Sequence, residues 1–378
     1  MAKKLPDIKK RDNGYFEMKI TVAPNVRKSV YGKSETEVRR KAKQLREEAA
    51  RYDISNITKM TVESYMRRWL IDVKQPDLKP GSFDRVEQSL EYQIFPYIGH
   101  IQLSALTSND IQQMINSILE KWSFSTAKKA YNNLNSCLEL AVTKGEITKN
   151  PVNVVKLPSA KNKVTKEVNA YTSEEIEAIV DEAKRTYSNG APVYRYGYVI
   201  ILLLNTGMRE GEPLFLKWDD VDFEKRRIYV HGNVVDVKNR DENAEANYTI
   251  IEQETAKTAK STRYIPLNDN AVEALENLRS IIKDDHRVIA TKNHTIVSTH
   301  KIYTTMRNIV RRCNISGKAN LVHSLRHTFA TTLIRNGVDI KAVSEILGHE
   351  DAATTLKIYH HVIEEQKHAA VTALDNLY

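Results

Sequence analysis

Residues 321–330 read LVHSLRHTFA, an apolar run at helical spacing that contains two histidines and one arginine. On a helix, His323 shares one face with both Arg326 and His327. The spacing of the two histidines also suits a metal, but the zinc signature HExxH needs a glutamate where Ser324 stands. The positively charged side chain of Arg326 would also lie on the metal-binding face. A pair of core histidines and a phosphate site both remain open from this stretch alone.

The chain has 378 residues, and its excess of basic residues lies near the N-terminus. Residues 1–60 contain 16 Lys/Arg against 8 Asp/Glu, whereas residues 61–160 contain 11 against 10. A concentrated basic module fits a polyanionic partner, most often nucleic acid. A solvated basic face explains the charge equally well.

Only two cysteines are present, Cys137 and Cys313, and they lie far apart in the sequence. They argue against a disulfide framework and are typical of a reducing cytosol, so we expect a cytoplasmic protein. The N-terminus MAKKLPDIKK lacks the apolar segment of a secretory signal. The longest apolar run, 199–204, is too short to span a membrane, and we expect no membrane partner.

The basic N-terminal part predicts a small sheet followed by one helix. Residues 11–31 alternate polar and apolar residues around two turn signals, which indicates two or three short strands. Residues 34–50 predict a helix capped by Ser34, with Glu37 three residues on. Such a module suits DNA reading, because β-ribbons enter the major groove. The candidate DNA contacts are Lys9, Lys10, Arg11, Lys19, Arg27 and Lys28, joined by Lys128 and Lys129 further along the chain.

The rest of the chain predicts two more domains of mainly α structure. Residues 61–155 contain about four capped amphipathic helices. Residues 156–170 are polar, lysine-rich and free of aromatic residues, as in a linker. Residues 226–267 predict strands, and the pattern is mostly helical from Asp269 to about Lys367. We therefore expect a multidomain, mainly α protein with a β-sheet-plus-helix domain over 1–58, a helical domain over 59–155, a linker over 156–170 and a mixed α+β, mostly helical domain over 171–378.

Two stretches of the last domain place basic side chains beside apolar segments. In 202–218, an apolar helix ends at Thr206-Gly207, and Arg209 follows with Glu212 as a candidate partner that orients its guanidinium. A purely structural Arg–Glu pair is the alternative. Residues 254–267 predict a hairpin whose turn carries Lys257, Lys260 and Arg263, although lysines at a hairpin tip are usually only solvated.

Residues 346–362, ILGHEDAATTLKIYHHV, contain a histidine and a tyrosine that suit packing when each is read alone. His349 follows Gly348 at a helix end, and Tyr359 lies ten residues later in a second helix. Across the domain, the candidate set is then two arginines, two histidines, a lysine and a tyrosine, without clustered carboxylates. Two-metal nucleases need such carboxylates. Two arginines can instead clamp a phosphodiester, histidine and lysine can move protons, and tyrosine can store the phosphate as a covalent ester.

This combination resembles the tyrosine recombinase (phage integrase) family, and the match covers nearly the whole chain. The order and the spacing of the motifs agree with the family. In this sequence TGMREGE carries the first family arginine as Arg209, the KT of TAKTAKSTRYIPL carries the lysine as Lys257, HSLRHTFAT carries His323 and Arg326, LGH carries His349, and TTLKIYHHV carries the nucleophile Tyr359. Lys260 is the alternative for the lysine. His327 is assigned to packing or to support of the site.

The resemblance implies a site-specific DNA recombinase that acts through a 3′-phosphotyrosyl intermediate and needs no ATP, metal or other cofactor. Its first two domains resemble the arm-binding and core-binding domains of integrases from mobile elements and temperate phages. Such enzymes act as tetramers on double-stranded DNA, and the segment after Tyr359 often docks on a neighbouring subunit. Excisionase and host DNA-bending proteins are partners that the sequence leaves open. A type IB topoisomerase and a non-catalytic DNA-binding regulator are the alternative functions.

Overall fold

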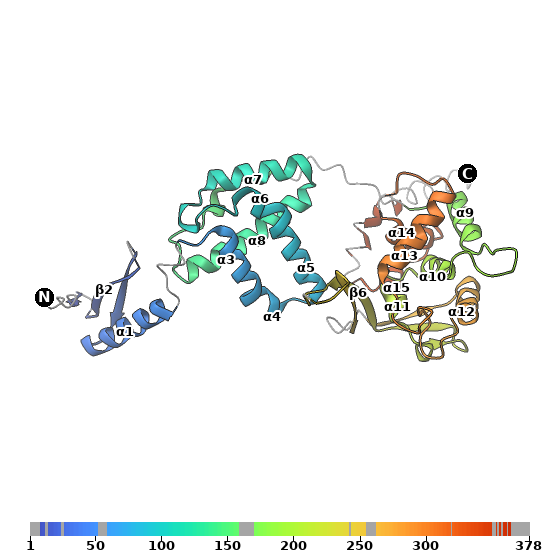
Figure 1. Ribbon diagram of the computed structural model, residues 1–378, viewed down its shortest axis with the longest axis horizontal. Coiled ribbons are helices and arrows are strands. Elements are labelled where there is room, and N and C mark those ends of the chain that lie inside the picture. The colour runs from blue at the N-terminus through green and yellow to red at the C-terminus, as the bar shows by residue number, and fades with distance from the viewer. Residues whose placement is uncertain are drawn as a thin grey trace, which may run out of the picture. The chain divides into compact units, whose positions relative to one another are not determined.

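The computed structural model describes residues 8–11, 14–23, 26–51, 59–158, 170–241, 243–254, 262–318 and 320–349, together with Ala353, Thr355, Leu356, Ile358, Tyr359, His360, Val362 and Ile363. The chain divides into two compact units, residues 1–163 and 164–378 (Figure 1). The boundary falls within the stretch 156–170 that the sequence predicts as a linker, most of which lies outside the described residues. The finer division of the first unit into two domains stays a prediction.

The N-terminal part is a three-stranded antiparallel sheet with a helix on one face, as the sequence predicts. The sheet has the order β1 (Ile8–Lys10), β2 (Phe16–Ala23), β3 (Val26–Gly32), and α1 (Glu35–Arg51) follows. A small core of buried residues joins the sheet to the helix: Met18, Ile20, Val30, Val38 and Ala42. At the helix start the Ser34 hydroxyl accepts from the Glu37 amide at 3.2 Å, so the predicted cap is present.

Residues 61–155 are helical, as expected. The elements are α3 (Val62–Trp69), the π-helical turn η1 (Leu70–Lys74), α4 (Gln75–Asp77), α5 (Pro80–Ser89), the π-helical turn η2 (Leu90–Ile94), α6 (Phe95–Ile98), the 3-10 turn η3 (Leu103–Ala105), α7 (Ser108–Lys121), α8 (Phe124–Thr143) and the 3-10 turn η4 (Pro151–Val154). Thr61 caps α3, and Thr107 forms a capping box with Asp110 at the start of α7. One apolar core, which includes Cys137, joins these helices.

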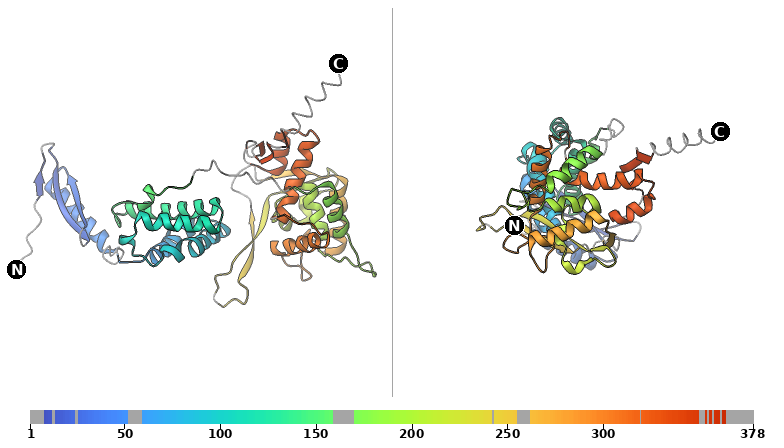
Figure 2. Two further views of the ribbon diagram at one scale, coloured as in Figure 1. Left: turned by 90° about the horizontal axis from the view of Figure 1, so that it is seen from above. Right: turned by 90° about the vertical axis from the view of Figure 1, so that its right-hand side faces the viewer.

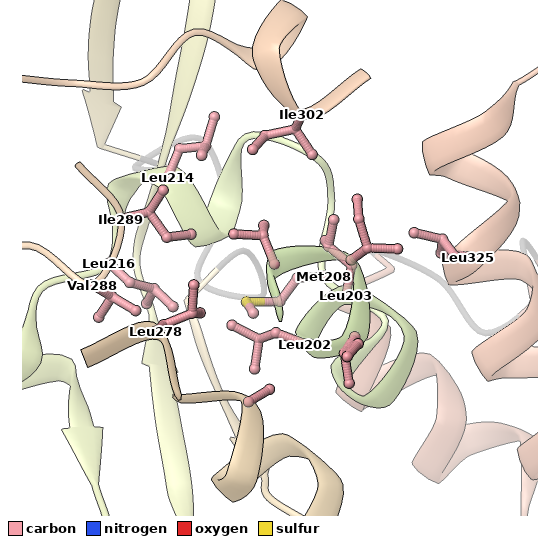
Figure 3. Packing of buried hydrophobic residues seen from close by; sticks show 14 of the residues in the cluster. Leu202, Leu203, Met208, Leu214, Leu216, Leu278, Val288, Ile289, Ile302 and Leu325 are labelled. Carbon is pink, nitrogen blue, oxygen red and sulfur yellow. The ribbon is translucent and has the colours of Figure 1, made fainter. Parts of the chain in front are cut away.

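The second unit is built around α10 (Gly197–Thr206), a helix that is apolar on nearly every side. Helices α9 (Ser173–Ala183), α12 (Asp269–Ile282), α13 (Thr299–Arg312) and α14 (Leu321–Arg335) pack against it. Figure 3 shows Leu202 and Leu203 of α10 among side chains from α12, α13 and α14. Because α10 is enclosed, the backbone that leaves its C-terminus is held in place, and the candidate site begins there.

Two small sheets lie beside these helices, after α11 (Glu212–Phe215) and the 3-10 turn η6 (Trp218–Asp220). One has the order β4 (Val221–Asp222), β5 (Arg227–Val230), β8 (Arg263–Pro266), and the other pairs β6 (Gly232–Lys238) with β7 (Tyr248–Glu254). The β6–β7 pair extends from the helices of this unit in Figure 2. The first part of the range 226–267, which the sequence predicts as strands, is thus divided between two sheets before Gly232, where a Cβ would lie 2.3 Å from the Phe215 ring.

The predicted hairpin over 254–267 is wrong. Strand β7 pairs with β6, whereas β8 pairs with β5, so the two segments belong to different sheets. The residues between them, 255–261, include Lys257 and Lys260 and lie outside the described part of the chain. Arg263 belongs to strand β8 and not to a turn.

The C-terminal part of the unit closes a separate small core. After α14 come α15 (Ile340–Leu347) and a helical stretch in which the described residues lie between 353 and 363. This core joins α14, α15 and the stretch that carries Tyr359, and its buried members are Ala330, Ile334, Val343, Leu347, Tyr359 and Val362. This packing brings the tyrosine onto the face of α14.

Candidate active site

The site begins where α10 ends. Gly207 has φ +62°, a left-handed conformation that favours glycine, and a Cβ there would lie 2.4 Å from the Phe329 ring. The chain therefore turns out of the core at the predicted Thr206-Gly207 position, and Arg209 follows on the surface side with 45% of its side chain exposed. The Gly207 carbonyl stays inside and accepts from Arg326 Nη1 at 2.8 Å.

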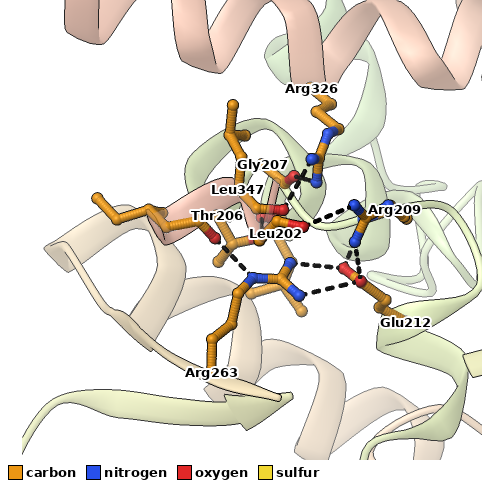
Figure 4. A network of polar contacts seen from close by, with 10 residues as sticks. Leu202, Thr206, Gly207, Arg209, Glu212, Arg263, Arg326 and Leu347 are labelled. Atoms are coloured by element: carbon orange, nitrogen blue, oxygen red, sulfur yellow. Dashed lines mark hydrogen bonds and ion pairs between the residues drawn. The ribbon is translucent and has the colours of Figure 1, made fainter. Parts of the chain in front are cut away.

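Glu212 is the central carboxylate of the site, with only 2% of it exposed. The predicted pairing is present: Arg209 Nη1 donates to Glu212 Oε1 at 2.9 Å, and the Arg209 amide donates to Oε2 at 2.8 Å. Arg263 binds the same carboxylate with both terminal nitrogens, at 3.0 and 2.8 Å (Figure 4). Burial alone would raise the pKa of Glu212, but the bonds from Arg263 and the charge of Arg209 hold it below its usual value.

Arg263 belongs to the site, although its sequence context indicates only a turn residue. It lies on β8, where Arg263 and Ile265 are buried and Tyr264 between them is exposed. This alternation is the signal that could have found it, because the side chain of every second strand residue points to the same face. Its side chain is 6% exposed, so it needs the carboxylate of Glu212 as a partner.

Three arginines donate to consecutive carbonyls at the C-terminal end of α15. Arg263 Nε donates to the Ile346 carbonyl at 2.6 Å, Arg326 Nη2 to Leu347 at 2.7 Å, and Arg209 Nη2 to Gly348 at 3.0 Å (Figure 4). The last carbonyls of a helix lack partners within the helix and form its partly negative end. The end of α15 therefore aligns the guanidinium groups before any substrate is bound.

Helix α14 carries Arg326 between two histidines. Arg326 is 4% exposed, and burial together with the nearby charge of Arg209 lowers its pKa to about 9. His323 lies one turn earlier and is exposed, whereas His327 is half-buried. The two imidazole rings meet edge to face with centroids 4.5 Å apart. Burial lowers the pKa of both histidines, that of His327 to about 4, so both rings are neutral at pH 7.

Tyr359 is almost fully enclosed, with 1% of it exposed. Burial raises the pKa of its phenol to about 12, while the charge of Arg326 acts in the opposite direction. Its hydroxyl lies 2.9 Å from Nδ1 of His327. The sequence predicts a packing or supporting role for His327, and the structure places this histidine in direct contact with the tyrosine.

His349 completes the described part of the site. It follows the left-handed Gly348 that ends α15, and its Nδ1 lies 2.7 Å from the Thr355 hydroxyl. Burial, followed by the charges of Arg326 and Arg209, lowers the pKa of His349 to about 4. The imidazole is therefore neutral at pH 7 and keeps one N–H that can donate to an anion.

The structure thus brings most of the candidate residues to one place. These are Arg209, Glu212, His323, Arg326, His327, His349 and Tyr359, with Arg263 added. Lys257 and Lys260 lie outside the described residues, as does the C-terminal segment 364–378. Within the part of the chain that is described, no group of three or more His, Cys, Asp or Glu side chains is placed to hold a metal ion. The described helices also include none that is long and apolar enough to cross a membrane.

The candidate DNA-binding residues of the N-terminal sheet divide between its two faces. Strand register pairs Lys9 with Glu17, Lys19 with Ser29, and Thr21 with Arg27, which sets Lys9, Lys19 and Arg27 on the face opposite α1. Arg11 joins this face by donating to Glu17. Lys10 and Lys28 pair with Phe16 and Ile20, on the face that α1 covers. In the helical part, Lys128 and Lys129 are exposed on α8.

Comparison with known families gives two matches. The model described as "Phage integrase family" matches residues 169–366, and that described as "Phage integrase, N-terminal SAM-like domain" matches residues 61–119. A "Tyrosine recombinase XerC-like" protein of Caldanaerobacter subterraneus subsp. tengcongensis is 28% identical over 404 aligned positions, which cover 100% of both chains. The "Integrase" of Staphylococcus phage L54a is 23% identical over 85% of this chain and 95% of its own.

Solved structures of integrases share the fold. The Tn1549 transposon integrase in complex with transposon right end DNA has a TM-score of 0.65 and 22% identity, covering 84% of this chain and 100% of that one. The lambda integrase tetramer bound to a Holliday junction has a TM-score of 0.56 and 20% identity, covering 93% of this chain and 97% of that one.

Proposed function

Because this chain belongs to the phage integrase family and is a tyrosine site-specific recombinase, we propose that it integrates and excises a mobile DNA element. In this proposal Tyr359 attacks a scissile phosphate, forms a 3′-phosphotyrosyl link and releases a 5′-hydroxyl. A second round of exchange resolves the resulting Holliday junction. The convergence of Arg209, Arg326, His349 and Tyr359 in one described site supports this reading.

The two arginines neutralise the phosphate as it becomes pentacoordinate, and this electrostatic contribution is usually the largest in such reactions. His349 donates a hydrogen bond to the same phosphate, and the exposed His323 serves either as a second phosphate ligand or as the proton acceptor from Tyr359. Lys257 protonates the departing 5′-oxygen. The energy of the phosphodiester is kept in the covalent link, so the reaction requires no ATP, and the guanidinium groups take the place that metal ions hold in two-metal nucleases.

The proposed partner is double-stranded DNA, bound at core sites by residues 59–155 and at arm-type sites by residues 1–58. The solved relatives are an integrase on transposon DNA and an integrase tetramer on a Holliday junction, which supports a homotetramer on DNA here. We place the reaction in the cytoplasm of a bacterial host. Excisionase and a host DNA-bending protein are candidate accessory factors that set the direction of the reaction.

A nicked suicide substrate tests the nucleophile. The wild-type chain is expected to form a covalent adduct with such a DNA, and Tyr359→Phe is expected to bind the DNA without forming it. Tyr187→Phe is the matched control, because Tyr187 is 59% exposed and lies before α10, and it should form the adduct at the wild-type rate. An adduct formed by Tyr359→Phe would show that the nucleophile is another residue. Supercoil relaxation without paired sites would favour a topoisomerase instead.

A further inference from the structure

His327 is hydrogen-bonded to the hydroxyl of Tyr359, the proposed nucleophile. Its Nδ1 lies 2.9 Å from the Tyr359 hydroxyl, within hydrogen-bond reach for proton transfer, and the two rings are 5.9 Å apart between centroids. His323, the histidine that the family motif points to, contacts the ring of His327 and is exposed. The two histidines of α14 therefore have different surroundings: His323 is exposed at the surface, and His327 contacts the tyrosine.

Both members of this hydrogen-bonded pair are neutral in the empty site. Burial keeps the phenol protonated by raising its pKa to about 12. Burial, His323 and Arg326 keep His327 neutral by lowering its pKa to about 4. Two neutral groups can form this bond in either direction, depending on which ring nitrogen carries the proton. In the tautomer with the proton on Nε2, the tyrosine hydroxyl donates to an unprotonated Nδ1, which is the arrangement that proton transfer to His327 uses.

We propose that His327 is the catalytic proton acceptor for Tyr359, while His323 is left to bind the phosphate. This inference rests on the proposed function, because it needs Tyr359 as the nucleophile. During cleavage the Oη–H bond breaks and its proton goes to Nδ1 of His327, while the Oη–P bond forms and the P–O5′ bond breaks. The departing O5′ takes a separate proton from the proposed acid, Lys257.

The reverse step uses the same groups. When the free 5′-hydroxyl of a partner strand attacks the phosphotyrosine, protonated His327 returns its proton to the departing Oη. The charged group that faces His327 is Arg326, on its own helix. The titratable groups that face it are His349, after α15, and His323 and Tyr359, whose rings contact its own. A positive imidazole beside Arg326 is unfavourable in the empty site. The negative charge of a bound phosphate offsets it, so the transfer is coupled to DNA binding.

The decisive variant is His327→Asn, because the asparagine oxygen sits near the position of Nδ1 and accepts a hydrogen bond without being a useful base. If His327 only positions the tyrosine, this variant should cleave at close to the wild-type rate. If His327 accepts the proton, cleavage should slow by about 10²–10⁴-fold, the usual contribution of a general base. His286→Gln is the matched control, because His286 is exposed and is not one of the site residues, and this variant should cleave at the wild-type rate.

The second measurement changes the acidity of the nucleophile. Trifluorotyrosine at position 359 has a more acidic phenol and needs less help from a base, so it should restore most of the activity lost in His327→Asn. A 5′-bridging phosphorothiolate substrate relieves the need for a leaving-group acid, and it should not restore activity to His327→Asn. Wild-type cleavage by His327→Asn, or equal losses with the natural and the fluorinated phenol, would overturn the proposal.

These outcomes are separate from those of the nucleophile test. Cleavage by Tyr359→Phe refutes the proposed function and with it the role of His327. A covalent adduct that depends on Tyr359 but not on His327 refutes only the present inference. DNA affinity and thermal unfolding of His327→Asn, measured on the full chain, show whether its fold is intact. Where the asparagine variant unfolds, His327→Gln with the fluorinated tyrosine provides the same comparison.

Discussion

Neutralising Glu212 should be among the most damaging single changes in the second unit. In Glu212→Gln the carboxylate that binds both Arg209 and Arg263 loses its charge, and one oxygen becomes an NH2 group that faces N–H donors. Glu212 is 2% exposed and the Arg263 side chain 6%, so Arg263 is left as a buried charge without its partner. Breaking a buried pair in this way costs about 3–5 kcal/mol of the free energy of unfolding.

That loss is a large part of the total stability of a domain, which is typically about 5–15 kcal/mol. Urea unfolding of the full chain measures it, and hydrogen exchange of the peptide that covers α15 locates it, because Arg263 holds the Ile346 carbonyl. Glu345→Gln, an exposed carboxylate on the same helix, is the control and should stay within about 0.5 kcal/mol of wild type. The double variant Glu212→Gln/Arg263→Met should lose less than the two single losses together.

The pH dependence gives a second check on the same pair. The pKa of Glu212 is lowered in the folded state, so its stabilising contribution is present above the ordinary pKa of a glutamate and is lost as the pH falls through the lowered value. The difference between wild type and Glu212→Gln should therefore shrink in acid. Equal stability of Glu212→Gln and Glu345→Gln at pH 7 would refute the view that a buried ion pair holds this site.

Three further outcomes are expected. Arg326→Lys should reduce the cleavage rate by about 10²–10³-fold with DNA affinity nearly unchanged, because one ammonium cannot bind the Gly207 and Leu347 carbonyls in the fork geometry of a guanidinium. Single-turnover cleavage measures this rate, and a wild-type rate would contradict the prediction. Glu210→Gln should stabilise the fold at pH 8 by on the order of 1 kcal/mol, after a discount for partial exposure, and not at pH 4.5. The reason is that burial, followed by the charge of Asp236, raises the pKa of Glu210 to about 7, so the wild-type protein loses free energy of unfolding as the pH rises and this carboxyl ionises. An equal gain at both pH values in calorimetry would contradict this. Lys19→Gln should reduce the slope of log affinity against log salt on arm-type DNA by about 1, whereas Lys10→Gln, on the opposite face of the sheet, should leave it unchanged; equal slopes for the two variants would remove the distinction between the faces.

Local features of the fold could be predicted from the sequence because their causes are local. Ser34 and Thr61 mark helix starts by the bonds that their hydroxyls accept, and Gly207 marks the end of α10 by its left-handed backbone. The pairing of Arg209 with Glu212 is also local, because three residues separate them. These predictions required only the neighbouring residues.

The rest depends on segments that meet across long stretches of chain. Strand β8 pairs with β5 across the whole β6–β7 pair, and no local pattern shows this choice over a simple hairpin. The local pattern therefore predicts a turn residue at Arg263, although its side chain is buried against Glu212. In the same way, the sequence does not show which of the two histidines beside Arg326 contacts Tyr359. The packing of Tyr359 against Ala330 and Ile334 places its hydroxyl beside His327.

The three guanidinium groups at the end of α15 also determine how much charge the site presents. Arg209, Arg263 and Arg326 bring three positive charges, Glu212 removes one, and the neighbouring histidines are neutral at pH 7. Among these described side chains, two positive charges are left over. A phosphodiester in its resting state carries one negative charge, whereas the two non-bridging oxygens of a pentacoordinate phosphorus carry two. The surplus therefore matches the transition state better than the bound substrate, which is the condition under which electrostatic binding accelerates a reaction.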